Sequence, residues 1–192
     1  MISESPVARG APLRGRRSVD LEVLFGQCFG ARWHTRLDGG GSEPQYLPSA
    51  DAGPHRLIYR ENFFASALHE TAHWCIAGAR RRRQVDFGYW YLPDGRDAAA
   101  QRAFEAVEAR PQALEWVFSV AAGVPFRPSA DNLTGAGGDG VAFAQAVAGA
   151  LHRYLENGLP PRAALFADAL GAAYGTGDWR RPERYGLVQE LL

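Results

Sequence analysis

The sequence predicts a single α+β domain that is rich in helix, with a small sheet and a metal site on a central helix. Three observations lead to this fold class. The chain has 192 residues, which is enough to bury one core of ordinary size. Apolar residues recur at helical spacing over most of the chain, and only a few short segments have the composition of strands. Two histidines, His69 and His73, lie four residues apart inside an apolar helical segment.

Composition excludes several classes of protein. Hydrophobic residues make up 46% of the chain and charged residues 22%, as in ordinary soluble domains. The net charge is zero, so no overall charge favours a nucleic acid or a membrane surface as partner. No apolar run reaches the roughly 18 residues of a transmembrane helix, and the arginine-rich start lacks the apolar segment of a secretory signal. Cys28 and Cys75 are far apart and are expected to be reduced core thiols of a cytoplasmic protein.

The first elements follow from local patterns. Residues 1–17, rich in glycine, proline and arginine, are predicted to be a disordered tail, which leaves 18–192 as the domain. Asp20 is predicted to cap a helix that runs to about Phe29, because apolar residues follow it at helical spacing. Three glycines within residues 38–42 predict a turn or a flexible loop.

The middle of the chain alternates strands with one helix. Segments 45–48 and 56–60 have the composition of short strands. A helix is expected at 62–78, with Gly78 as its C-terminal cap. A third strand is predicted at 85–92, followed by a Pro-Asp-Gly turn.

Helices account for the second half of the chain. Asp97 is predicted to cap a helix that ends near residue 109. Pro111 is predicted to begin another helix that runs to Gly123, because proline suits the first turn. Residues 124–138 contain prolines and a glycine-rich tip and are expected to be irregular. Two further helices complete the domain: 140–157 and 160–173.

The segment His69-Glu70-Thr71-Ala72-His73 is the strongest indication of function. Residues i and i+4 of a helix lie on one face, so both imidazoles can bind one ion. In zinc hydrolases with this H-E-x-x-H pattern, the glutamate acts as general base, which makes Glu70 the catalytic candidate. Burying these three side chains is costly unless something compensates them, which favours a metal over two hydrogen-bonded core histidines.

A catalytic metal needs a third protein ligand. Glu108 is the preferred candidate, because Gln112 lies one turn later and can hold it by a hydrogen bond. Glu105, one turn earlier, is the alternative; surface glutamates that only stabilise the helix are the other interpretation. Two histidines and one carboxylate fit a zinc hydrolase as well as an iron(II) oxygenase, and spacing alone does not decide between them.

Longer motifs surround these residues: Tyr46-Leu47-Pro48, FASALHE at 64–70, HWCIAG at 73–78, DFGYWYLPDGRD at 86–97, VEARPQAL at 107–114 and AAGVPF at 121–126. Together these motifs resemble the elongation factor P hydroxylase family. The resemblance extends from about residue 20 to about residue 175. The glycine-rich tip at 135–140 and the N-terminal tail depart from the family pattern.

The resemblance implies a non-haem iron enzyme that hydroxylates a lysine of elongation factor P after a β-lysyl group has been attached to it. It implies His69 and His73 as metal ligands, with Glu108 inferred as the third. Fe(II), with zinc as the alternative, and O₂ are the expected cofactors. No arginine or Ser/Thr pair is assigned to 2-oxoglutarate, so the co-substrate stays open. Glu70 would then orient a ligand, deliver a proton or contact the substrate amine.

Two surfaces are expected to meet the substrate. An aromatic and acidic groove for the cationic arm would use Tyr89, Trp90, Tyr91, Asp94 and Asp97. Strand alternation turns Trp90 away from its two neighbours, and core aromatics beside a helix-capping turn are the alternative. A basic run is the expected docking surface for the acidic factor, with a solvated charge run as the alternative: Arg80, Arg81, Arg82 and Arg83.

Two other functions fit parts of the sequence. An H-E-x-x-H zinc metallopeptidase is supported by the core motif alone. A non-catalytic binding protein stabilised by a metal would need the ligands but no turnover. Neither a membrane nor direct contact with nucleic acid is expected.

Overall fold

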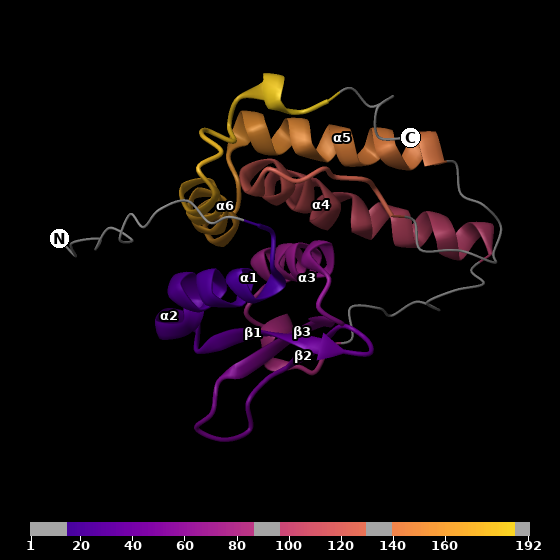
Figure 1. Ribbon diagram of the computed structural model, residues 1–192. Helices are drawn as coiled ribbons and strands as arrows, with labels where there is room; N and C mark the ends of the chain where they lie inside the picture. Colours follow the sequence, from indigo (N-terminus) through magenta and orange to yellow (C-terminus); the bar gives the residue numbers. More distant parts are fainter. Residues whose placement is uncertain (1–14, 87–96, 130–139, 187–192) are drawn as a thin grey trace.

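The computed structural model describes residues 15–86, 97–129 and 140–186. A three-stranded sheet forms one side of the molecule, α1 and α3 lie against it, and α4, α5 and α6 cover the far side of α3 (Figure 1). The main helices have these bounds: α1 (Ser18–Phe25), α3 (Phe64–Ile76), α4 (Ala98–Ala122), α5 (Gly140–Asn157) and α6 (Pro161–Tyr174). The predicted α+β class is confirmed. No helix in these three ranges combines the length and the apolar character needed to span a bilayer.

The first helical segment is longer than predicted. After α1 the chain continues through a π-helical turn and a further short helix: η1 (Gly26–Gly30) and α2 (Ala31–Trp33). Packing of Phe29 against Trp74 of α3, with 4.7 Å between ring centroids, favours this extension. The prediction that Asp20 caps the helix is wrong. Arg17 holds the cap position, and Asp20 lies within the first turn, where its carboxylate pairs with Arg17 at 2.7 Å.

The chain contacts the domain already at Arg16. Its Nε donates to the carbonyl of Ala122 at 2.7 Å, and its guanidinium lies 4.6 Å from the ring centroid of Tyr174. Most of the predicted tail, residues 1–14, lies outside the described residues. The domain boundary at residue 18 therefore stays a prediction.

The sheet has the order β1-β3-β2, with β3 parallel to β1 and antiparallel to β2. Its strands are β1 (Thr35–Gly41), β2 (Gln45–Leu47) and β3 (His55–Arg60). The strands predicted at 45–48 and 56–60 are confirmed, but the loop predicted at 38–42 is wrong. A Cβ on Gly39 would lie 2.6 Å from the hydroxyl of Tyr59, so the missing side chain lets the strand pack closely.

Helix α3 occupies most of the predicted range, but Gly78 does not cap it. The cap position is held by Ala77 in an extended conformation. Arg162 of α6 donates to the carbonyls of Trp74, Cys75 and Ala77 at 3.0, 2.9 and 2.6 Å. Side-chain donors from another helix therefore satisfy the last carbonyls that a glycine cap would otherwise have served.

Helix α4 is one helix where the sequence predicts two. Asp97 caps it as expected, accepting hydrogen bonds from the second and third residues of the helix, and Gly123 ends it in the left-handed conformation. Pro111 lies inside the helix, so the predicted break is wrong. Pro111 cannot donate to the carbonyl of Val107, but Val107 is 49% exposed, on the side where water can replace the missing donor.

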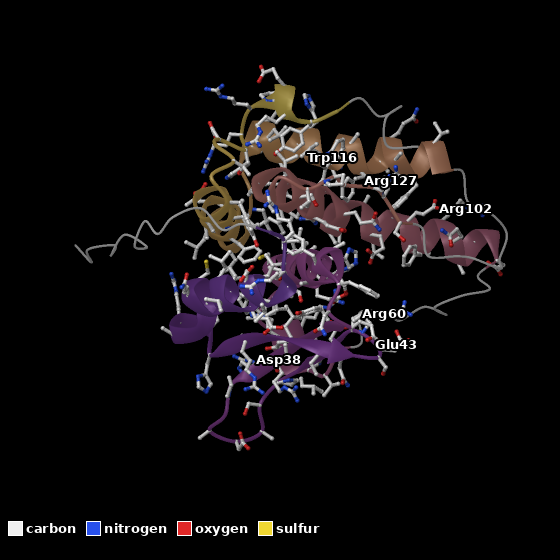
Figure 2. All side chains as sticks on the ribbon, viewed as in Figure 1. Asp38, Glu43, Arg60, Arg102, Trp116 and Arg127 are labelled. Carbon is white, nitrogen blue, oxygen red and sulfur yellow. The ribbon has the colours of Figure 1, made fainter. Side chains whose placement is uncertain are left out.

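The remaining elements agree with the sequence or fall outside the described residues. The helices expected at 140–157 and 160–173 are confirmed as α5 and α6, and residues 124–129 are irregular as expected. Asp86 forms an isolated bridge with Tyr46; the rest of the strand predicted at 85–92 and the turn after it lie mostly or wholly outside the described ranges. Figure 2 places Trp116 on the helical side of the molecule and Asp38 on the sheet side. Trp116 belongs to the core, which joins the helices to the sheet.

Candidate metal centre

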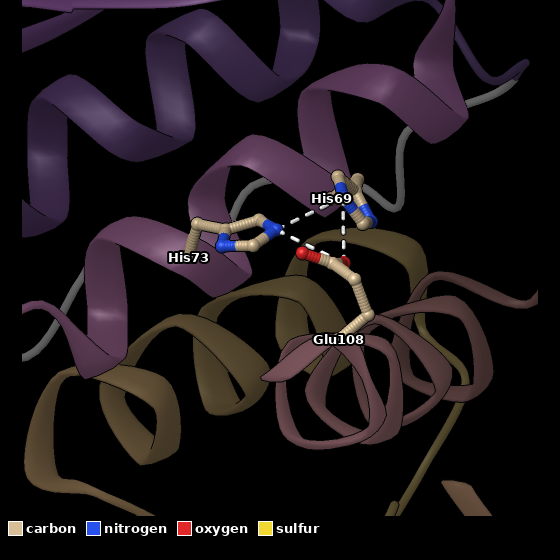
Figure 3. A group of neighbouring side chains, drawn as sticks. All are labelled: His69, His73 and Glu108. Carbon is tan, nitrogen blue, oxygen red and sulfur yellow. Dashed lines mark hydrogen bonds and ion pairs between the residues drawn. The ribbon is translucent and has the colours of Figure 1, made fainter. Parts of the chain in front are cut away.

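Three side chains converge between α3 and α4. His69 and His73 project from successive turns of α3, and Glu108 reaches them from α4 (Figure 3). The Nε2 atoms of the two rings are 3.0 Å apart. Oε2 of Glu108 lies 3.3 Å from Nε2 of His73 and 3.6 Å from Nε2 of His69. Two nitrogens and one oxygen therefore face a common point.

The separations between these atoms fit one shared ion. Nitrogen and oxygen ligands bind such metals at about 2.1 Å, so two of them lie about 3.0 Å apart at a right angle and about 3.4 Å apart at a tetrahedral angle. The observed 3.0, 3.3 and 3.6 Å are close to these values. Oε2 of Glu108 is buried and makes no well-aligned hydrogen bond among the described residues; its polar contacts are the two ring nitrogens. Such an atom is costly to bury, and a cation would compensate it.

Charge around the group also favours a cation. Glu70, Glu108 and Glu115 bring three carboxylates to two imidazoles. Burial would lower the pKa of His69, but Glu115, by its charge and hydrogen bond, together with the charges of Glu70 and Glu108 raises that pKa to about 10. Burial would likewise raise the pKa of Glu108, but His73 and His69 hold it below its ordinary value. Glu108 therefore keeps a negative charge although it is only 2% exposed.

Glu115 is a site residue to which the sequence analysis assigned no role. Its Oε2 accepts a hydrogen bond from Nδ1 of His69 at 2.8 Å. This contact keeps a proton on Nδ1 and turns Nε2 toward the shared point. Glu115 follows Glu108 by seven residues, two turns of α4, so their common face could have been read from the spacing.

The structure separates the two carboxylates that the sequence offered as third ligand. Glu105 is not part of the group, because its Oε1 accepts from the amide of Gln101 at 2.9 Å. Gln112 lies near Glu108 as expected, and a hydrogen bond from it contributes to the lowered pKa of Glu108. The amide of Gln112 also exchanges two hydrogen bonds, of 2.7 and 2.9 Å, with the backbone of Ser129. Gln112 thus links the carboxylate to the loop after α4.

A pocket adjoins the group on the side of His73. Glu70 lines it together with Tyr46 and Trp74. Glu70 is 7% exposed. Burial raises its pKa above the ordinary value, and the two histidines oppose this increase. The pocket therefore brings a buried acidic group next to a candidate metal ligand.

The structure describes only some of the predicted substrate and docking residues, and their roles stay predictions. Asp97 is exposed and caps α4, as in the alternative interpretation in which it belongs to a helix-capping turn and not to the groove. The other groove residues lie outside the described ranges: Tyr89, Trp90, Tyr91 and Asp94. Within the basic run, Arg80, Arg81 and Arg83 are exposed and Arg82 is half-buried. Arg81 pairs with Asp86, and Arg82 donates to the carbonyl of Ala77. Three of the four, Arg81–Arg83, form the short 3₁₀ helix η2.

Comparison with known proteins shows a family and a relative to which this chain is similar. Residues 24–183 match the family described as "Elongation factor P hydroxylase". The chain is also 51% identical over 160 residues to a protein of Haemophilus influenzae named "Elongation factor P lysine hydroxylase". That match covers 83% of this chain and 90% of the relative. The three converging side chains and Glu115 all lie within the family match.

Proposed function

Since the chain belongs to the elongation factor P hydroxylase family, we propose that it hydroxylates the β-lysylated lysine of elongation factor P through a metal held by His69, His73 and Glu108. The protein is a hydroxylase and hence an oxidoreductase. The resemblance found in the sequence motifs is confirmed by the family match. The zinc metallopeptidase and the non-catalytic binding protein are not favoured by either comparison.

The observation that carries the metal assignment is the buried Oε2 of Glu108, which faces two imidazole nitrogens and makes no well-aligned hydrogen bond among the described residues. Two histidines and one carboxylate are the ligand set of non-haem iron(II) oxygenases, and zinc binds the same atoms. When bound, Fe(II) together with O₂ supplies the oxidising power that hydroxylation of an unactivated C–H bond needs. Glu115 holds the ring of His69 during this chemistry, and Gln112 holds Glu108.

We assign Glu70 to the part of the pocket next to His73, where the substrate would react. It lies three residues before His73 on the same helix, so both side chains reach the pocket. Its carboxylate can accept a proton or hold the substrate amine. The two pocket arginines, Arg81 and Arg82, are bonded to Asp86 and to the carbonyl of Ala77, so neither is assigned to 2-oxoglutarate.

Elongation factor P is the proposed protein partner, and a cytoplasmic location follows from its role in translation. The exposed Arg80 and Arg83 are the part of the basic run that is available to an acidic surface. Arg81 and Arg82 are assigned to stabilising this chain, because Arg81 pairs with Asp86 and Arg82 donates to the carbonyl of Ala77.

The test is the intact mass of β-lysylated elongation factor P after incubation with the protein, Fe(II), O₂ and a reductant. We expect a gain of one oxygen atom, absent with His73→Ala and retained with Glu105→Gln, which changes a glutamate on the same helix outside the group. Elongation factor P without the β-lysyl group tests whether that group is required. A gain of oxygen that persists with His73→Ala or after full removal of metal would contradict the metal assignment.

A further inference from the structure

The pocket beside His73 has a distribution of charge that indicates its ligand. We propose that it binds a primary ammonium group at the end of an alkyl arm, with the carboxylate of Glu70 as the group that holds the charge. This inference rests on the proposed function and deepens it, because it assigns the end of the substrate arm to a defined part of the site.

The position of Glu70 is the first support. Glu70 and His73 are three residues apart on α3, and both line the pocket. An amine held at Glu70 therefore keeps the neighbouring carbons of its arm on the side where His73 lies. A carboxylate that is only 7% exposed needs a compensating partner, and an ammonium group supplies one by a charge-assisted hydrogen bond.

The arginines of the pocket form no ion pair with Glu70, although the charge of Arg81 acts on it from a distance. Nε of Arg81 pairs with Oδ2 of Asp86, which leaves this pair neutral. Arg82 donates to the carbonyl of Ala77 and its guanidinium lies 6.0 Å from the ring centroid of Trp74. Among residues 15–86, 97–129 and 140–186, no arginine lies within ion-pair distance of Glu70. Glu70 therefore has the charges of the two histidines beside it but no arginine ion pair, and its carboxylate can hold a ligand in the pocket.

The walls of the pocket suit the stem of such an arm. Tyr46, Leu57 and Trp74 line it, and all three are almost fully buried. Methylene groups that pack against these side chains are removed from contact with water. This favours binding of an alkyl chain over a small hydrated cation. Of the two carboxylates that line the pocket, Asp86 is paired with Arg81, so Glu70 is the acidic group that these apolar side chains leave for an ammonium on a long stem.

Binding is measured by calorimetry with zinc-loaded protein, so that no turnover interferes. The two ligands are β-lysylated elongation factor P and the same protein with the amines of the arm acetylated. We expect acetylation to weaken binding to the wild type by about tenfold or more, as loss of a charge-assisted hydrogen bond would. Glu70→Gln should weaken binding of the free amine by the same factor and show no further loss on acetylation. Glu70→Asp should restore part of the affinity, and Glu105→Gln should behave as the wild type.

Two results would overturn the pocket assignment. One is Glu70→Gln protein that loses as much affinity on acetylation as the wild type does. The other is competition by pentanoate, and not by pentylammonium, which would make the pocket an anion site of its arginines. Zinc affinity of each Glu70 variant checks that the metal group is intact. The mass experiment above reports separately on hydroxylation, so loss of turnover with charge-dependent binding intact would contradict the proposed function alone.

Discussion

Nδ1 of His69 donates a hydrogen bond to Oε2 of Glu115 at 2.8 Å, across the contact between α3 and α4. The same helix pair brings Glu108 to the other side of that ring. Glu115 of α4 thus orients the imidazole of His69. Glu108, two turns earlier on α4, faces Nε2 of the same ring. The packing of α3 on α4 is therefore what assembles the candidate centre.

The first prediction concerns this hydrogen bond. Glu115→Gln keeps the shape of the side chain but removes the charge that fixes the proton on Nδ1 of His69. We expect the affinity for Zn(II) or Co(II) to fall by about 10–100-fold, the usual cost of losing such a partner. Competition with a chelator of known affinity measures this change. An affinity equal to that of Glu105→Gln protein would show that Glu115 does not orient the ring.

Metal binding should stabilise the fold. A ligand at a concentration about 100 times its dissociation constant adds about 2.7 kcal/mol to the free energy of unfolding, which for a chain of this size raises Tm by about 5–10 °C. Calorimetry with and without Zn(II) should show this increase for the wild type. Glu108→Ala removes the buried oxygen that faces both rings and should abolish the shift. A similar shift in both proteins would mean that the ion binds elsewhere.

Stability should fall at alkaline pH. Burial raises the pKa of Cys28 to about 11 and those of Tyr59 and Tyr174 to about 12, from ordinary values of 9.0 and 10.0. Because the folded pKa values are higher, these groups favour the folded state while they are protonated, and the contribution is lost as pH rises through about 9 to 12. Urea unfolding at about pH 8 and about pH 10.5 measures the decrease. Cys28→Ala should reduce it, and a constant free energy would contradict the assignment.

Arg162, on α6, should stabilise the C-terminal end of α3, the helix that carries His69 and His73. Arg162→Ala removes the donors to the carbonyls of Trp74, Cys75 and Ala77. Hydrogen bonds from a charged group contribute about 1.5–3 kcal/mol, so we expect a loss of this size in the free energy of unfolding by denaturant. Arg153→Ala, at an exposed position of α5, is the matched control and should change it by less than about 0.5 kcal/mol. Equal effects of the two substitutions would argue against capping by Arg162.

The basic run should act in docking through its exposed members. Arg80→Ser together with Arg83→Ser should raise the apparent KM for elongation factor P at low salt, and the difference should disappear at high salt because surface charges are screened. Arg82→Ser should instead lower the free energy of unfolding, since Arg82 contacts Ala77 and Trp74. An unchanged KM of the double variant at low salt would contradict docking of elongation factor P by Arg80 and Arg83.

Local patterns were reliable where the cause is local. The spacing of His69 and His73 places both rings on one face of any helix, and Asp97 caps α4 because its side chain reaches amides two and three residues away. The preference for Glu108 over Glu105 agrees with the placement of the three side chains, because Gln112 one turn later was visible in the spacing. The family resemblance also depended only on residue order and was confirmed.

Local patterns failed where a distant group supplies the missing interaction. Gly39 belongs to a strand because Tyr59 needs the space of its absent side chain, and Gly78 does not cap α3 because Arg162 reaches its carbonyls. Pro111 stays inside α4 because solvent can serve the carbonyl that it leaves without a donor.

Residue type and spacing along the chain are enough to give the family, the helix-rich α+β class and the pair of histidines on one helix. Three contacts became known from the folded chain alone: Glu115 holds His69, Arg162 donates to the last carbonyls of α3, and Glu70 lines a pocket with His73. These contacts join residues that are far apart in sequence or depend on how helices and sheet pack together. Their geometry is fixed when apolar faces are buried against each other, and no local spacing encodes it.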